Sequence, residues 1–177
     1  NREMLDQVLD FFQLVTDYNL NIMQPNQSLN MLSSRILAEM DTILEREQFK
    51  LVFVHGDTTT LTLVALASFH RNCKVVHIEA GLRTYNKQSP LPEELNRQLT
   101  GRISDFHFAP PQKAKSNLLN ENVNISSIVV TGNTIVDALH IALNNIEKGH
   151  TNAFIENLNV TINFNKKVIL VTGHRRK

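Results

Sequence analysis

From residue 50 onward, short apolar runs alternate with stretches of helical periodicity. The runs occupy residues 51–54, 74–78, 105–108 and 128–130. The helical stretches occupy residues 59–71, 92–103, 111–120 and 135–146. Runs that are apolar throughout and alternate with helices are typical of parallel strands covered on both faces. We therefore predict an α/β fold built on a parallel sheet with flanking helices.

The segment before residue 50 is mainly helical in pattern. Apolar residues recur at helical spacing from Met4 to Phe12, which predicts a first amphipathic helix. Residues 18–23 have the pattern of a short strand. A second helix is expected after Ser28, because serine is a preferred N-cap residue and an apolar stripe follows it as far as Leu44.

A polar, asparagine-rich stretch divides the chain. We predict an N-terminal domain over residues 1–148, a linker over residues 149–165, and the first strand and turn of a second domain over residues 166–177. The strand of the second domain is expected at residues 167–171. The chain opens with Asn1 in helix-like sequence and ends directly after this strand, so we expect it to be an excerpt of a longer protein.

Composition argues against several classes of protein. The formal net charge is +1 and 42% of the residues are apolar, which disfavours a nucleic-acid-binding surface and a disordered chain. No apolar run approaches the roughly 20 residues of a membrane span, and the N-terminus lacks a signal-peptide pattern, so we expect a cytoplasmic protein without membrane contact. Cys73 is the single cysteine, which excludes an internal disulfide and predicts a buried thiol. The glycine-rich fingerprints of nicotinamide and ATP sites are missing from the sequence.

Carboxylates follow the predicted strands and open one of the helices. Asp57 comes after the first apolar run, Glu79 comes after the second, and Glu93 and Glu94 follow Pro92 at a predicted helix start. The carboxyl ends of the strands in an open parallel sheet form the ligand crevice. Several acids at one crevice indicate proton chemistry.

Five sequence blocks carry a family resemblance. They are HGDTTT at 55–60, HIEAGLRT at 77–84, SPLPEELNR at 89–97, TGNTIVDA at 131–138 and TGHRR at 172–176. In this order they closely resemble the non-hydrolysing bacterial-type UDP-N-acetylglucosamine 2-epimerases, and the resemblance spans essentially the whole chain. Members of that family carry two Rossmann-like domains in the arrangement called GT-B. The resemblance implies that this chain is an incomplete N-terminal Rossmann-like half of such a protein.

The resemblance also implies an activity and its partners. That family inverts carbon 2 of the sugar, interconverting UDP-GlcNAc and UDP-ManNAc by eliminating UDP and adding it back, for surface polysaccharide precursors. The implied partner is a nucleotide sugar, and a homodimer is implied for the full-length protein. No metal and no redox cofactor is expected, because elimination and re-addition need only acid, base and charge.

Site residues are assigned by position in the matching blocks. Three carboxylates match the acid and base residues of the family, and one histidine matches its residue near the diphosphate; these are Asp57, Glu79, Glu93 and His174. We assign to substrate binding Arg83, Arg97, Asn133 and Arg175. Arg97 lies one helical turn after Glu93, so we expect it to orient that carboxylate.

Each candidate also has a plainer interpretation. Asp57 suits the N-cap of the following helix, and Glu79 suits a stabilised turn. Glu93 and Glu94 complement the positive end of their helix, and we expect Glu94 to do only that. His55 and His77 are expected to set the shape of the turns or to lie in the core, and His107 has no functional cluster around it.

Two departures and three alternatives stay open. Tyr85 stands where the family usually has glycine, and the chain ends at Lys177 where the family continues with glutamate. A hydrolysing 2-epimerase that releases free ManNAc and UDP would need the same carboxylates. A GT-B glycosyltransferase would share the architecture without needing this set of acids. The third alternative is a non-catalytic remnant, and we expect the excerpt alone to be inactive because a central strand is missing from it.

Overall fold

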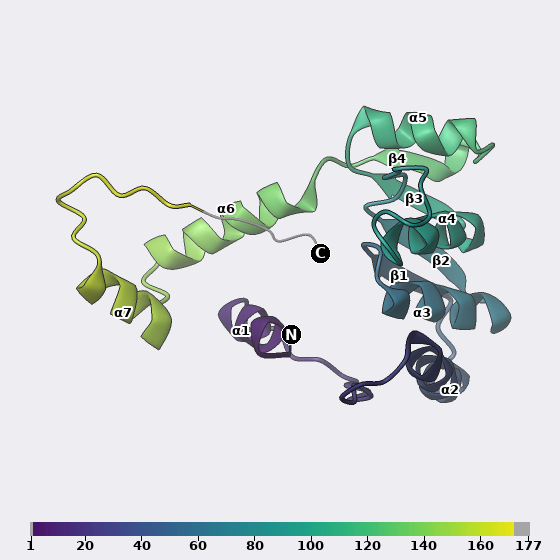
Figure 1. Ribbon diagram of the computed structural model, residues 1–177, viewed down its shortest axis with the longest axis horizontal. Helices are drawn as coiled ribbons and strands as arrows, with labels where there is room; N and C mark the ends of the chain where they lie inside the picture. The colour runs from purple at the N-terminus through teal and green to yellow at the C-terminus, as the bar shows by residue number, and fades with distance from the viewer. Residues whose placement is uncertain (1, 172–177) are drawn as a thin grey trace. The chain divides into compact units, whose positions relative to one another are not determined.

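The computed structural model describes residues 2–171, and these form two compact units (Figure 1). One unit consists of residues 17–136 and holds the whole sheet. The other combines the described residues of the segments 1–16 and 137–177. Within residues 2–171, no helix has the length and apolar character needed to cross a membrane.

The sheet contains four parallel strands in the order β1-β2-β3-β4. The strands are β1 (Leu51–His55), β2 (Lys74–Ile78), β3 (Phe106–Ala109) and β4 (Ile128–Val130). Each pairs with its neighbour in sequence, and the register places His77 beside both Val54 and His107. The predicted α/β class and all four predicted strands are therefore confirmed, with ends shifted by one residue at most.

Helices connect consecutive strands. They are α3 (Thr59–His70), α4 (Glu93–Ile103) and α5 (Gln112–Asn120). α2 (Leu29–Glu47) packs on α3, and the Ser28 hydroxyl caps it by accepting a hydrogen bond from the Met31 N–H at 3.2 Å. The predicted cap is confirmed. The strand predicted at residues 18–23 is wrong, because that segment is irregular and pairs with no other strand.

Small and branched apolar side chains form the core beneath these helices. Val54 packs with Leu61 and Ala65 of α3. Cys73 is buried beside Leu44, and its thiol donates to the Phe49 carbonyl oxygen at 2.8 Å, so the predicted buried thiol is confirmed. The opposite face of β1 is open, since Phe53 is 56% exposed. The expected cover on both faces is therefore found on one face of this strand only.

The turn after β2 lies directly against α5. Gly81 has φ +85°, and a Cβ built on it would lie 2.3 Å from the Ala114 carbonyl oxygen. The Asn117 side-chain amide donates to the Gly81 carbonyl oxygen at 2.9 Å and is itself buried. A backbone this close to a helix admits no side chain, so this position requires glycine.

Residues 137–171 contain more helix than the sequence predicted. α6 (Thr134–Glu147) is followed by α7 (Ala153–Thr161), whose N-cap is Asn152; the Asn152 side chain accepts from the Ile155 N–H at 2.9 Å. The range predicted as a linker thus includes a capped helix. α1 (Arg2–Phe11) belongs to the same unit, where Phe11 meets the His150 ring edge to face at 5.1 Å.

The strand predicted at residues 167–171 is wrong, because those residues have no regular structure. A strand depends on hydrogen bonds from a neighbouring strand, and no described segment pairs with this one. The compact units separate at residue 136, ahead of the predicted boundary at 148. The division into domains at 1–148, 149–165 and 166–177 stays a prediction.

Candidate active site

Three of the predicted site residues lie just past the carboxyl ends of the strands. Asp57 follows β1, Glu79 follows β2 and Asn133 follows β4. Thr58 is the N-cap of α3, with its hydroxyl accepting from the Leu61 N–H at 3.5 Å. The plainer interpretation of Asp57 as a helix cap is therefore wrong, and its carboxylate is left for other contacts.

Those contacts come from α4. The Asp57 carboxylate accepts two hydrogen bonds from Arg97, at 2.7 Å from Nη2 and 3.1 Å from Nε. The Asn96 side chain donates to the Asp57 carbonyl oxygen at 2.9 Å. We expected Arg97 to orient Glu93, but the hydrogen bonds of its guanidinium go to Asp57 and, at 3.2 Å, to Glu94. Tertiary packing explains why Arg97 binds Asp57: α4 packs against α3, and this brings Arg97 to the end of β1.

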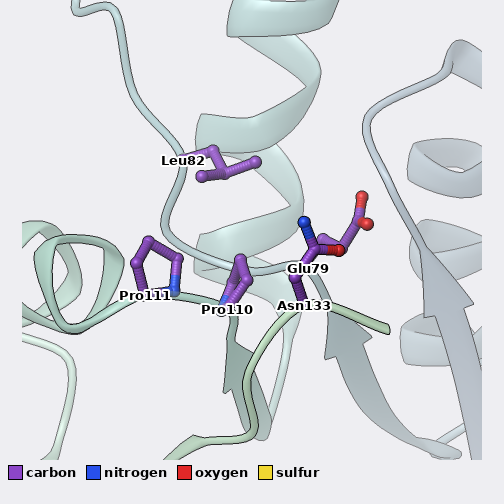
Figure 2. Close-up of a pocket in the computed structure, with 5 residues that line it drawn as sticks. All are labelled: Glu79, Leu82, Pro110, Pro111 and Asn133. Atoms are coloured by element: carbon purple, nitrogen blue, oxygen red, sulfur yellow. The ribbon is translucent and has the colours of Figure 1, made fainter. Parts of the chain in front are cut away.

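Glu79 lies beside a cavity of about 300 Å³. The cavity is lined by Glu79, Leu82, Pro110, Pro111 and Asn133 (Figure 2). Glu79 has φ +65°, and its carboxylate lies 3.2 Å from His55 Nε2. The His55 side chain is 55% exposed, so of the two expected positions the core is excluded, and its contact with Glu79 places it at the turn.

Asn133 shapes the turn that enters the cavity. Gly132 before it has φ +82°, and the Asn133 side chain accepts from the Ile135 N–H at 3.1 Å at the start of α6. Gly132 and Asn133 thus form the turn between β4 and α6. The amide nitrogen of Asn133 is free of this contact, because only the side-chain oxygen takes part in it.

Glu93 and Glu94 differ sharply in their surroundings. Glu94 is fully buried and accepts hydrogen bonds from the Thr84 and Tyr85 N–H groups at 2.9 and 3.0 Å. Burial alone would raise the pKa of Glu94, but these bonds and those from Gln98 and Arg97 hold it below its ordinary value, so the group is ionised. The prediction that Glu94 only complements the helix dipole is wrong. Glu93 is partly buried, and its Oε2 is buried without a hydrogen-bond partner.

The backbone conformation at Tyr85 explains why glycine is usual at this position in the family. Tyr85 has φ +61°, in the left-handed region where glycine is favoured and other residues cost about 1–2 kcal/mol. The Glu94 carboxylate binds the Tyr85 N–H and thereby stabilises this conformation. The family preference for glycine at this position is thus consistent with a turn that tyrosine also adopts here.

Arg83 does not face the cavity. Its side chain is fully buried and forms two hydrogen bonds with the Glu121 carboxylate, at 2.8 and 2.9 Å. A third bond reaches the Leu82 carbonyl oxygen at 2.8 Å. All these contacts fasten the turn after β2 to the end of α5, and the assignment of Arg83 to substrate binding stays a prediction. Local sequence does not indicate this pairing, because Glu121 is far away along the chain.

The structure brings the predicted residues together only in part. Asp57 is joined to α4 through Arg97, and Glu79 shares a cavity with Asn133. Asp57 and Glu93 do not line that cavity. His174 and Arg175 lie outside the described residues. Among residues 2–171, no group of three or more histidine, cysteine or acidic side chains is placed to hold a metal ion.

Two buried histidines lie beneath the site. His77 and His107 are paired across β2 and β3, and each is almost fully buried. The His77 Nε2–H donates to the Gly56 carbonyl oxygen at 2.8 Å, which fixes the turn before Asp57. Burial lowers the pKa of His77, and lowers that of His107 to about 4, so both rings are neutral. The expected core position of His77 is confirmed.

A fall in pH should lower the free energy of unfolding, because the buried His77 and His107 are neutral in the folded protein. The unfolded chain protonates histidine near its ordinary pKa of about 6.5. The folded pKa of His107 is lower, about 4, so stability is complete above pH ~6.5 and is lost as the pH falls toward 4. The His107 shift alone corresponds to roughly 3 kcal/mol once the pH has fallen to about 4, and to roughly 2 kcal/mol at pH 5. Urea unfolding at pH 7 and pH 5 measures the loss at pH 5.

His107→Gln should make the free energy of unfolding depend less on pH, because glutamine does not titrate. His140→Gln, at an exposed histidine of α6, is the matched control and should keep the wild-type slope. An unchanged slope in His107→Gln would contradict the assignment.

Comparison with known proteins gives one consistent result. A family model described as UDP-N-acetylglucosamine 2-epimerase matches residues 1–177. The UDP-N-acetylglucosamine 2-epimerase of Salmonella borreze is 52% identical over all of this chain and 47% of its own length. The crystal structure of the UDP-GlcNAc 2-epimerase from Neisseria meningitidis bound to UDP-GlcNAc is 50% identical, with a TM-score of 0.79 over 82% of this chain and 40% of that one.

A more distant structure extends the likeness. The Methanocaldococcus jannaschii UDP-GlcNAc 2-epimerase in complex with UDP-GlcNAc and UDP is 36% identical, with a TM-score of 0.77 over 89% of this chain and 42% of that one. The chain spans about half the length of the curated relatives it matches.

Proposed function

This chain belongs to the UDP-N-acetylglucosamine 2-epimerase family, and we propose that the full-length enzyme containing it interconverts UDP-GlcNAc and UDP-ManNAc without net hydrolysis. The observation that carries the proposal is the pair of carboxylates, Asp57 and Glu79, at the carboxyl ends of adjacent strands in a chain matched throughout by that family. Relatives solved with UDP-GlcNAc and UDP support a nucleotide sugar as the substrate.

The proposed reaction needs only proton transfer and control of charge. A base removes the proton from carbon 2, the electron pair forms a double bond to carbon 1, and UDP leaves with the electrons of the broken bond. The proton then returns to the opposite face of carbon 2, and a UDP oxygen attacks carbon 1. The sum of these steps is inversion at carbon 2, so no electron carrier is required.

We assign the acid and base roles to Asp57, Glu79 and Glu93. The fixed carboxylate of Asp57 and the unpartnered buried oxygen of Glu93 support these roles, because a group that moves a proton must be held in place and have an oxygen available. Asn133 is assigned to the sugar, with support from its position beside Glu79 in the cavity. His174 and Arg175 are assigned to the diphosphate on the resemblance alone.

Nuclear magnetic resonance of the sugar products tests the proposal. The full-length enzyme incubated with UDP-GlcNAc in D₂O should give UDP-ManNAc with deuterium at carbon 2. Free ManNAc and UDP as the main products would instead support a hydrolysing 2-epimerase. No change in the sugar would support the non-catalytic alternative.

We further propose that the chain by itself has no measurable epimerase activity and binds UDP weakly. The cavity of about 300 Å³ is at the small end of the range for ligand sites, and the chain spans 47% of a close relative. Isothermal titration that finds micromolar UDP affinity would contradict this. The cytoplasmic location, the role in polysaccharide precursor synthesis, the GT-B arrangement and the homodimer stay predictions.

A further inference from the structure

Glu94 is a buried carboxylate whose hydrogen-bonding capacity is unusually well used. One oxygen accepts from the Tyr85 N–H at 3.0 Å and from Gln98 Nε2 at 2.9 Å. The other accepts from the Thr84 N–H at 2.9 Å and from Arg97 Nη1 at 3.2 Å. A fully buried charge is costly unless it is paired and hydrogen-bonded, and here both conditions are met.

Arg97 divides its guanidinium between two carboxylates. Nη1 faces Glu94, whereas Nη2 and Nε face Asp57. The Arg97 side chain is only 16% exposed, so few other positions are open to it. A planar guanidinium held at one edge by a buried anion presents its remaining N–H groups in a fixed direction.

We propose that Glu94 is a positioning residue for Asp57, acting through Arg97. Glu94 fixes the guanidinium, and the guanidinium fixes the carboxylate at the end of β1. The same carboxylate also holds the backbone at residues 84 and 85, between the turn that bears Glu79 and the helix that bears Glu93. This inference rests on the proposed function, because it gives Glu94 a part in the same proton transfer.

An amide at position 94 would disturb this arrangement without changing its size. Glutamine offers one acceptor oxygen, and its NH₂ group is a donor that faces N–H groups of Arg97 or of the backbone. The Arg97 guanidinium then loses the carboxylate that holds its Nη1, and the Asp57 carboxylate that it binds can move. A misplacement of about 1 Å in a reacting group costs roughly 10²-fold in rate, so a partial loss of order is expected to cost about 10- to 100-fold.

The test compares kcat and KM in the full-length enzyme. Glu94→Gln should lower kcat by about 10- to 100-fold and change KM by less than about 2-fold. In an Arg97→Gln background the same substitution should cost clearly less than in the wild type, because the route to Asp57 is already broken and only the contacts with the backbone of residues 84 and 85 are lost. Circular dichroism verifies that each variant is folded at the assay temperature.

Glu47→Gln is the control. Glu47 ends α2, and its carboxylate accepts a hydrogen bond from Arg46 Nε at 2.9 Å and another from the Tyr18 hydroxyl, so it is also a carboxylate paired with an arginine but has no bond to Asp57 or Arg97. This variant should leave kcat within about 2-fold of the wild type. Equal losses from Glu94→Gln in both backgrounds, or an unchanged kcat, would overturn the inference. A wild type without epimerisation would instead overturn the proposed function, so the two failures are distinguishable.

Discussion

Asp57→Asn in the full-length enzyme is expected to reduce kcat by about 10²- to 10⁴-fold, the usual contribution of one positioned acid or base. Asparagine keeps the shape of the side chain and one acceptor oxygen for Arg97, but it does not take up a proton. The Asn96 contact to the Asp57 carbonyl oxygen involves the main chain and survives the change. The fold and the binding of the nucleotide sugar should therefore persist. Product formation measures kcat, and isothermal titration with UDP-GlcNAc measures binding.

Asp41→Asn provides the control for this experiment. Asp41 lies on α2 and is also paired with an arginine, Arg71, so its substitution removes the same kind of ion pair at an exposed position. It should leave kcat unchanged. Turnover that survives Asp57→Asn would remove Asp57 from the mechanism, and a loss of binding with unchanged kcat would make it a recognition residue.

Gly81→Ala should have the largest effect on stability. The new methyl group would lie 2.3 Å from the Ala114 carbonyl oxygen and 3.0 Å from the Leu118 side chain, and both belong to α5. Backbone strain at φ +85° adds about 1 kcal/mol to the cost of overpacking, which is itself about 1–3 kcal/mol or more. We expect the free energy of unfolding to fall by about 3 kcal/mol or more. Equilibrium unfolding in urea measures the change.

Gly132→Ala separates strain from steric conflict. Gly132 has φ +82°, nearly the same backbone conformation, but an added Cβ would meet nothing within 4 Å. This variant should lose only about 1 kcal/mol. Similar losses in the two variants would show that the contact with α5 contributes little.

The sheet was predictable because the burial of its strands determines the pattern of apolar residues in the sequence. β1 begins with four consecutive apolar residues and β2 contains Val75, Val76 and Ile78, and this leaves a signal in a short window of sequence. The prediction failed where a local pattern depended on a neighbour. Residues 167–171 have strand propensity without a described partner strand, and α7 forms in an asparagine-rich stretch because Asn152 caps it.

The site was less predictable than the sheet, because its contacts join residues that are distant in sequence. The local spacing of Arg97 suggested Glu93 as its partner, four residues before it, whereas its closest contact is Asp57, forty residues before it. The pairing of Arg83 with Glu121 likewise leaves no local signal, since the two residues are thirty-eight positions apart. Glu94 gave no signal of its own, because a glutamate at a helix start is ordinary. Only the packing of α4 identifies its four partners.

Glu94 binds the loop at residues 84 and 85 through two main-chain N–H groups and not through side chains. A carboxylate bound to main-chain N–H groups recognises the path of the chain and is indifferent to the side chains that the path carries. A substitution at position 85 can therefore leave the course of the loop unchanged, and the Tyr85 side chain, which is 56% exposed, lies on the outer surface. Position 84 is more restricted, because the Thr84 hydroxyl donates to the Ser89 carbonyl oxygen at 2.6 Å.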